Sequence, residues 1–210
     1  MPDQPPRGRF ITLEGIDGAG KSTHARWLAA ALAARGKRVV ATREPGGTPA
    51  GEAIREWLLH QSMGHDTEAL LMFAARREHV VRVIEPALAR GDLVLCDRFT
   101  DATYAYQGAG HGVSIEMIGE LARLVHGHCN PDLTLLFDVP SAVSRERLER
   151  MHAKGNELDK FEREAQAFFE RVRDGYLARA AGEPARFRII DSTRTVAQVR
   201  AQLGEIVDAL

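Results

Sequence analysis

Residues 15–22 are Gly-Ile-Asp-Gly-Ala-Gly-Lys-Ser, and they match the phosphate-binding loop pattern GxxxxGK[ST] at every fixed position. The loop follows an apolar run that ends at Glu14 and precedes a segment of helical period, as the pattern requires. Its glycines let backbone N–H groups turn inward at a positive helix end, where they bind anions. A glycine-rich turn without a ligand is the alternative, but the full pattern in this context favours a nucleoside triphosphate.

Side chains of the loop add to its backbone donors. Lys21 supplies positive charge for the β- and γ-phosphates, and the Ser22 hydroxyl can contact Mg²⁺. We therefore expect the phosphates of ATP to contact a continuous set of residues: Gly15, Ile16, Asp17, Gly18, Ala19, Gly20, Lys21, Ser22 and Thr23.

Outward from the loop, short apolar runs alternate with longer segments of helical period. The runs predict strands at 10–13, 38–41, 93–96, 133–137 and 187–190. Helices are expected at 21–35, 50–60, 66–89, 114–127, 141–152, 160–181 and 195–209. Near-continuous apolar strands are typical of parallel sheets covered on both faces. The pattern predicts a single α/β domain over 1–210, with five parallel strands joined by right-handed crossovers.

Composition excludes several classes of protein. The chain has 210 residues, 28 Lys and Arg against 29 Asp and Glu, and a net charge of −1, which argues against a nucleic-acid binder. No apolar run approaches the ~18 residues of a membrane span. Residues 1–8 are expected to form a flexible tail without the apolar core of a secretory signal. Cys96 and Cys129 are interpreted as buried free thiols, so a cytoplasmic protein is expected.

The third predicted strand ends in Asp97-Arg98, at the sheet edge where ligands gather. An acid there suits a water-mediated Mg²⁺ contact, and an arginine suits a phosphate. A structural ion pair is the alternative. The chain has no Asn-Lys-x-Asp element to read guanine, so a GTP-dependent switch is not expected.

Residues 141–164 are rich in basic side chains interleaved with glutamates. Phosphoryl transfer depends on alignment and on charge neutralisation, which a cationic lid over about 145–160 would supply while excluding water. The alternative is a solvated helix face with pairs such as Glu146 and Arg150. As a cluster, the basic residues favour the lid.

Taken together, the motifs resemble those of the thymidylate kinase family over nearly the whole chain. The matching segments lie at 14–22, 43–48 (Arg-Glu-Pro-Gly-Gly-Thr), 71–77, 97–99 (Asp-Arg-Phe), 103–108, 131–134, 158–162 and 168–173. The resemblance implies a nucleoside-monophosphate-kinase fold with a short basic lid. It also implies transfer of the ATP γ-phosphate to dTMP, giving dTDP and ADP, with Mg²⁺ held by Ser22 and Asp97.

Base and sugar contacts follow from the same resemblance. Phe73 would stack on thymine, and Arg77, one helical turn on, would hydrogen-bond the base. Thr103 and Gln107 would complete the base and sugar contacts, while Tyr106 would pack on the deoxyribose and leave little space for a 2′-hydroxyl. Plain core packing is the alternative for Phe73, because its helix is rich in apolar residues.

The resemblance also assigns the acceptor phosphate and the sugar hydroxyl. Asp17 would accept the 3′-OH, and Arg98 would hold the dTMP phosphate, assisted by the loop that contains Arg43 and Pro45. A sharp turn beside that phosphate favours a cis bond between Glu44 and Pro45.

Within the lid, Lys154 stands before the glycine, and residues 159–162 are Asp-Lys-Phe-Glu, where the family pattern has arginine in the second place. Lysine lacks the guanidinium fork, so Arg150 is the best lid candidate for catalysis. The expected catalytic residues are Lys21, Arg98, Arg150 and Lys154.

Two other functions stay open at this point. One is a kinase for another nucleotide or nucleoside, such as dCMP or UMP; the other is an ATPase switch. The family resemblance predicts a two-fold homodimer. Val80, Val81 and Ile84 are expected to form an exposed apolar stripe on the helix at 66–89, which would favour self-association. No nucleic-acid or membrane partner is expected.

Overall fold

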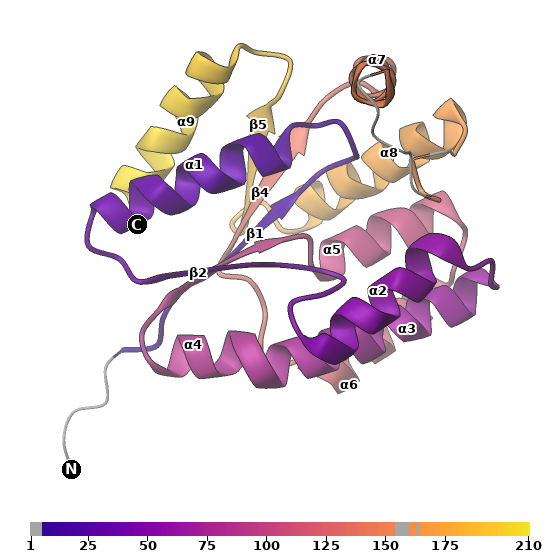
Figure 1. The fold of residues 1–210 in the computed structure, drawn as a ribbon, viewed down its shortest axis with the longest axis horizontal. Helices are drawn as coiled ribbons and strands as arrows, with labels where there is room; N and C mark the ends of the chain where they lie inside the picture. Colours follow the sequence, from indigo (N-terminus) through magenta and orange to yellow (C-terminus); the bar gives the residue numbers. More distant parts are fainter. Residues whose placement is uncertain (1–5, 154–159, 163) are drawn as a thin grey trace.

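The computed structural model describes residues 6–153, 160–162 and 164–210. Its centre is a five-stranded, all-parallel sheet in the order β2-β3-β1-β4-β5 (Figure 1). The strands are β1 (Phe10–Glu14), β2 (Val39–Arg43), β3 (Leu93–Asp97), β4 (Leu133–Asp138) and β5 (Phe187–Asp191). This confirms the α/β fold and all five predicted strands. Because β1 is central, the phosphate-binding loop that follows it lies in the middle of the carboxyl edge.

Both faces of β1 are covered, which explains why its residues are nearly all apolar. Ile11 and Leu13 share one buried cluster with Leu28 of α1 (Lys21–Ala34). Phe10 faces the other way and packs with Leu88 of α4 (Glu85–Ala89). Figure 1 shows α1 beside α9 (Val196–Asp208) on one side of the sheet and α4 on the other.

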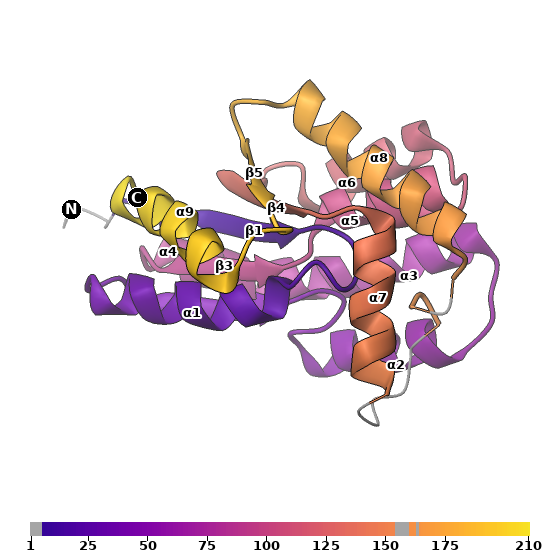
Figure 2. The same cartoon turned by 90° about the horizontal axis from the view of Figure 1, so that it is seen from above.

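The remaining helices surround the carboxyl edge. They are α2 (Pro49–His60), α3 (His65–His79), α5 (Thr100–Thr103), α6 (Ile115–His126), α7 (Ser141–His152) and α8 (Gln166–Gly182). Figure 2 shows α7 crossing the carboxyl ends of the strands. No helix in the described part of the chain is long and apolar enough to span a membrane.

The helix expected at 66–89 is one continuous helical segment with a wider turn inside it. That turn, η1 (Val80–Ile84), has π-helical hydrogen bonding between α3 and α4. Pro86 follows it; since proline has no N–H and clashes with the preceding turn, a wider turn is a usual accommodation. Val80 and Ile84 are fully buried, so the expectation that they supply an exposed apolar stripe is wrong; only Val81 of the three is exposed.

Residues 100–110 form a second helical segment, which sequence reasoning left unassigned. It comprises α5 and the π-helical η2 (Tyr104–Gly110). Small residues on both sides let it approach α8 closely. A Cβ on Gly110 of this segment would lie 2.5 Å from Phe168, and a Cβ on Gly175 of α8 would lie 2.7 Å from Ala109. Glycines disfavour an isolated helix, so tertiary packing stabilises this segment.

Two ends of predicted elements differ from expectation. Arg7 and Gly8, at the end of the expected tail, are attached: Arg7 pairs with Asp132, and Gly8 N–H donates to the Leu88 carbonyl at 2.8 Å. The helix expected at 160–181 begins only at Gln166. Cys96 and Cys129 are free and buried, as predicted.

Candidate active site

Two cavities meet at the carboxyl edge of the sheet. The P-loop cavity is lined by the phosphate-binding loop, by one side of α7 and by the start of α9. The inner cavity lies between α3, α5 and η2. Asp17, Glu44, Arg55 and Arg98 line both cavities, so the two spaces join at these side chains.

The phosphate-binding loop has the backbone that its glycines predict. Gly15, Gly18 and Gly20 have φ of 134°, 75° and 88°, a region that side chains disfavour. A Cβ on Gly15 would lie 2.4 Å from the Phe137 carbonyl oxygen, so glycine is also required by space.

Lys21 lies within this loop and is nearly buried. Its Nζ donates to the carbonyl oxygens of Gly15 (2.9 Å) and Ile16 (3.1 Å). Burial and the nearby Arg98 guanidinium lower the pKa of Lys21 to about 8. The ammonium group is therefore poorly solvated, and an anion in the P-loop cavity would be a strong partner for it.

Ser22 and Asp97 line the P-loop cavity together. Asp97 Oδ1 is buried and has no hydrogen-bond partner among the described residues. A hydroxyl and an unpaired carboxylate oxygen on one cavity are the oxygen donors that Mg²⁺ prefers. The residues present fit a magnesium ion.

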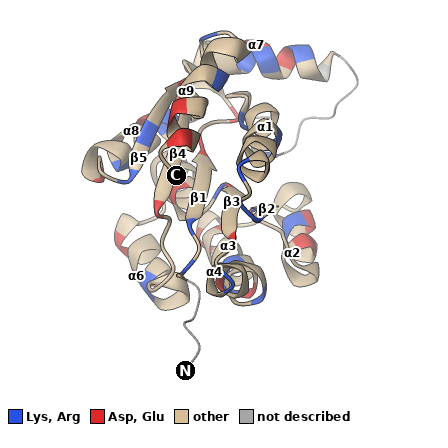
Figure 3. Ribbon diagram, turned by 90° about the vertical axis from the view of Figure 1, so that its left-hand side faces the viewer, with Lys and Arg blue, Asp and Glu red and all other residues tan. Residues whose placement is uncertain are grey.

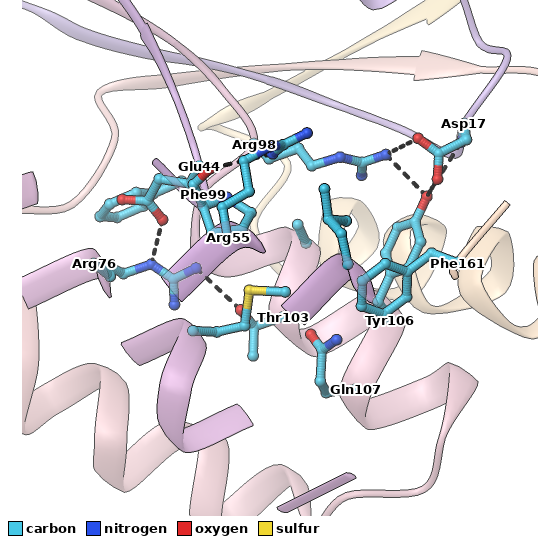
Figure 4. Close-up of a pocket in the computed structure, with 14 residues that line it drawn as sticks. Asp17, Glu44, Arg55, Arg76, Arg98, Phe99, Thr103, Tyr106, Gln107 and Phe161 are labelled. Carbon is cyan, nitrogen blue, oxygen red and sulfur yellow. Dashed lines mark hydrogen bonds and ion pairs between the residues drawn. The ribbon is translucent and has the colours of Figure 1, made fainter. Parts of the chain in front are cut away.

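Arg98 is the charged centre between the two cavities. It is the one described non-glycine residue with positive φ (69°), which turns its side chain back from the end of β3. Nη2 donates to Asp17 Oδ1 at 2.5 Å and to the Tyr106 hydroxyl at 3.0 Å, as Figure 4 shows. Burial disfavours the Asp17 carboxylate, but Arg98 and Lys21 outweigh it and lower the pKa of Asp17.

A buried pair behind Arg98 fixes its position. Arg98 Nη1 donates to the Tyr176 hydroxyl at 3.1 Å, and that hydroxyl donates to Glu14 Oε2 at 2.9 Å. Glu14 Oε1 accepts from the Phe99 N–H at 2.7 Å. Burial and the charge of Asp101 raise the pKa of Glu14 to about 8.

Arg76 closes the far end of the inner cavity. Its Nε donates to Glu44 Oε2 at 2.7 Å, and its Nη2 donates to Thr103 Oγ1 at 3.0 Å. Its guanidinium lies 4.7 Å and 5.1 Å from the ring centroids of Phe73 and Phe99. Nη1 is buried and has no partner among the described residues, so one guanidinium donor remains for a ligand.

Glu44 is positioned by a second contact, with His79. His79 Nδ1 lies 2.9 Å from Glu44 Oε1, and His79 Nε2 lies 2.7 Å from Thr42 Oγ1. Arg76 and the His79 contact together overcome the burial of Glu44 and lower its pKa. The Glu44–Pro45 bond is cis, as predicted.

The structure corrects two predicted base contacts. Phe73 is buried against Ala69 and Ile118 and does not line the inner cavity. Arg77 is exposed and donates to the Val125 carbonyl at 3.1 Å. The residues that line the cavity are each one position earlier, Met72 and Arg76. Since successive helical residues are rotated by about 100°, an error of one position exchanges a cavity face for a core face.

The other predicted acceptor residues lie at or near the inner cavity. Thr103, Tyr106, Gln107 and Pro45 line it, and Phe161 covers one side with its ring edge-on to Tyr106. Arg43 instead lines the P-loop cavity, where it pairs with Glu52 at 2.7 Å.

On α7, two arginines reach the P-loop cavity in different ways. Arg147 donates to the Gly18 carbonyl at 3.2 Å and to the Ser192 carbonyl at 2.8 Å. Arg150 also lines the cavity, but its side chain is 71% exposed and pairs with Glu146 at 2.6 Å. Figure 3 shows basic and acidic residues alternating along α7. The predicted Lys154 lies outside the described residues.

Sequence reasoning missed several residues of the site. Arg76 stands beside Arg77 in a motif that was recognised, so only the helical phase was needed to choose between them. Arg55 and Met72 carry no motif of their own. Tyr176 lies 78 residues from Arg98 in sequence, and no local pattern links the two.

Comparison with known proteins gives independent evidence of the family to which the chain is similar. The family model described as "Thymidylate kinase" matches residues 13–203. A protein of Cupriavidus metallidurans named thymidylate kinase is 59% identical over 204 residues, which cover 97% of this chain and all of that protein. Its counterpart in Bordetella petrii is 60% identical, with 97% of each chain covered.

Among solved structures, the crystal structure of thymidylate kinase from Ehrlichia chaffeensis is similar to this fold. The TM-score is 0.78 and the sequence identity is 36%, with 97% of this chain and 99% of that chain covered. The likeness therefore extends over nearly the whole of both chains.

Proposed function

The chain belongs to the thymidylate kinase family and transfers a phosphoryl group from ATP to dTMP, and from this premise we propose which of its residues bind each substrate. ATP occupies the P-loop cavity and dTMP the inner cavity. The chain works as one kinase domain, with the segment about 145–160 as its lid.

One observation carries this assignment: the two cavities meet at Arg98 and Asp17. A donor phosphate in the loop and an acceptor phosphate at Arg98 would lie side by side at that junction. In-line transfer requires this arrangement, because the attacking oxygen must approach the γ-phosphorus opposite the leaving oxygen.

At the acceptor end, Arg98 binds the dTMP phosphate, and Asp17 accepts the sugar 3′-OH. Thymine lies toward Arg76, whose buried Nη1 has no hydrogen-bond partner in the described part of the chain. Thr103 and Gln107 complete the base contacts, and the Tyr106 ring packs on the deoxyribose. The loop after β2 assists Arg98 with the dTMP phosphate through Pro45, which lines the inner cavity, and Arg43, which lines the P-loop cavity.

At the donor end, residues 15–23 hold the ATP phosphates, with Lys21 on the β- and γ-phosphates. Arg147 joins them from α7, where it already contacts the loop backbone. Arg150 acts on the transferring phosphate once its guanidinium turns from Glu146 into the cavity that it lines. Lys154 belongs to the same proposed lid.

Ser22 and Asp97 would hold Mg²⁺. A magnesium ion bound there supplies charge neutralisation at the donor phosphates. The chain itself needs no general base, because the second pKa of a phosphate monoester is ~6 and the acceptor oxygen is already ionised. What the residues contribute is alignment, charge and exclusion of water.

A panel of acceptors with ATP tests the assignment. We expect dTMP to be phosphorylated with the highest kcat/KM, the ribose form of TMP to be a poor acceptor because of Tyr106, and dCMP and UMP to be poor acceptors. Equal activity with dCMP would show that the inner cavity does not read the base as proposed. ADP release without any acceptor would instead favour the ATPase alternative.

We propose a homodimer in which α3 and α6 form the shared surface. Helices α3 and α6 pack against each other. Three apolar side chains are exposed there: Leu70 on α3 (48%), Val81 directly after α3 (37%) and Leu124 on α6 (76%). Exposed apolar residues that cluster favour self-association. A monomeric mass by sedimentation at micromolar concentration would contradict this.

The two free buried thiols fit a reducing compartment, so we assign the chain to the cytoplasm.

A further inference from the structure

Glu68 of α3 is a completely buried acid that lines neither of the two cavities. Both of its oxygens are used. Oε1 accepts from the Gln107 amide Nε2 at 2.8 Å, and Oε2 accepts from Lys160 Nζ at 2.5 Å. Gln107 is itself 99% buried, so its amide has few alternative partners.

This contact determines which end of the Gln107 amide faces the inner cavity. A carboxylate paired with an ammonium group has only acceptor oxygens, so the NH₂ end of the amide must face Glu68. The carbonyl oxygen then points away from Glu68. In Figure 4 the Gln107 amide points into the cavity, with its oxygen on the side of Thr103.

The cavity therefore presents one donor and one acceptor to a base. Arg76 Nη1 is the donor, because its other nitrogens are taken by Glu44 and Thr103. Gln107 Oε1 is the acceptor. Thymine and uracil offer the complement, an acceptor at O4 and a donor at N3–H. Cytosine offers the reverse, an amino donor at C4 and an acceptor at N3.

We propose that Glu68 is a positioning residue for base specificity: it locks the Gln107 amide so that the cavity accepts thymine or uracil and rejects cytosine. The proposal rests on the assignment of dTMP to the inner cavity and names the polarity of its base contacts. Without the lock, an amide can rotate by 180° and offer NH₂ to cytosine N3 at little steric change.

Lys160 strengthens the lock from the segment that follows α7. Its ammonium group holds Oε2, which leaves Oε1 turned toward Gln107. His65 and His111 also lie near Glu68, with their ligand atoms and a carboxylate oxygen within 4.8 Å of one another. Their rings are stacked at 10°, and lone pairs in parallel planes do not converge on one ion, so Glu68 is better explained by its contacts with Gln107 and Lys160.

The test is Glu68→Gln, which keeps the shape but offers Gln107 both a donor and an acceptor. We expect the ratio of kcat/KM for dTMP to that for dCMP to fall at least ~10-fold, the order expected for a mispaired buried group. Glu78→Gln is the matched control: the same change on the same helix, at a residue that pairs with exposed Arg82 and should leave the ratio unchanged.

A double-mutant cycle separates this role from a general loss of structure. In a Gln107→Met background, Glu68→Gln should not change the ratio further, because the amide that it orients is gone. A folded Glu68→Gln enzyme with the wild-type ratio would overturn the proposal, and so would an equal loss in the Gln107→Met background.

Two measurements on the wild-type enzyme complete the test. If Glu68→Gln does not fold, NMR of the wild-type enzyme decides: a slowly exchanging Gln107 side-chain amide supports the lock, and a rapidly exchanging one overturns it. If the wild-type enzyme accepts dCMP as readily as dTMP, the proposed base site fails, whatever the effect of Glu68.

Discussion

The inner cavity and α7 differ in how their charged residues are held. Around the inner cavity, Arg76 is buried and Arg98 is partly buried, and both are bound by partners from other elements. On α7, Arg145 and Arg150 are exposed, and among the described residues each forms an ion pair with a glutamate one turn away on the same helix. Exposed i,i+4 pairs contribute ~0.3–0.5 kcal/mol, whereas breaking a buried pair costs ~3–5 kcal/mol. In the proposed assignment, the acceptor side of the site is therefore held by buried or partly buried contacts before dTMP binds, whereas the exposed pairs on α7 are weak.

Lys21 lies between these regions and should show the largest effect. Lys21→Ala removes a charge donor that lies close to the reacting phosphates, and we expect kcat to fall on the order of 10³-fold with the fold intact. Steady-state kinetics and circular dichroism measure the two quantities. Lys37→Ala, at an exposed lysine beyond α1, should keep wild-type activity. Full activity of Lys21→Ala would refute the loop assignment.

A variant at Arg150 tests whether α7 takes part in phosphoryl transfer. Its interaction with the γ-phosphate would strengthen as charge moves, so Arg150→Ala should lower kcat by ~10²-fold, with smaller changes in either KM. Arg145→Ala is the matched control, because Arg145 has an equivalent pair with Glu149 but does not line the cavity. If the two variants behave alike, within about twofold of wild type, α7 has no catalytic arginine at 150.

Tyr176 tests how far the buried half depends on partners behind the cavity. Tyr176→Phe removes the hydroxyl that accepts from Arg98 and donates to Glu14. We expect the KM for dTMP to rise by about tenfold, while the KM for ATP changes little, because only the acceptor loses a positioned guanidinium. Tyr104→Phe is the control. The Tyr104 ring contacts the Arg179 guanidinium and lines neither cavity. An unchanged KM for dTMP would mean that Arg98 needs no support from α8.

Glu14 should give the smallest of these effects, a gradual change of the free energy of unfolding with pH. Its folded-state pKa is raised to about 8 from 4.5. Between these values the unfolded chain ionises while the folded chain keeps its proton, so this residue lowers stability as pH rises through the window. From pH 6 to 7 the wild type should lose about 1 kcal/mol relative to Glu14→Gln, which has no proton to lose. Denaturant unfolding at both pH values measures this, and parallel pH profiles would contradict it.

Local pattern was sufficient for much of the molecule. The five mostly apolar runs predicted a parallel sheet, because strands covered on both faces are mostly apolar, and all five are strands. The central strands β1, β3 and β4 are largely buried, while β2 and β5 at the edges carry exposed residues. The loop at 15–22 needed no tertiary information, since its glycines and Lys21 act within one turn of chain. The cis bond before Pro45 was predicted from the sharp turn expected beside the acceptor phosphate, and the bond is cis.

Side-chain direction required the tertiary structure. A motif located the helix that is predicted to bind the base. Whether residue 72, 73 or 76 faces the cavity depends on how α3 is rotated against its neighbours, and Phe73 lies in the core. The helical form of 100–110 depends on contact with α8, because its glycines give no helical preference of their own.

The chain by itself determined the fold class, the phosphate-binding loop and the family, because these depend on local periodicity and on residues adjacent in sequence. Only the tertiary structure decided which buried partners set the charge and direction of each site residue. Arg98 with Tyr176, Arg76 with Glu44 and Glu68 with Gln107 are pairs separated by 78, 32 and 39 residues. Such pairs form only when separate elements pack, since a buried polar group must find its partner across the fold.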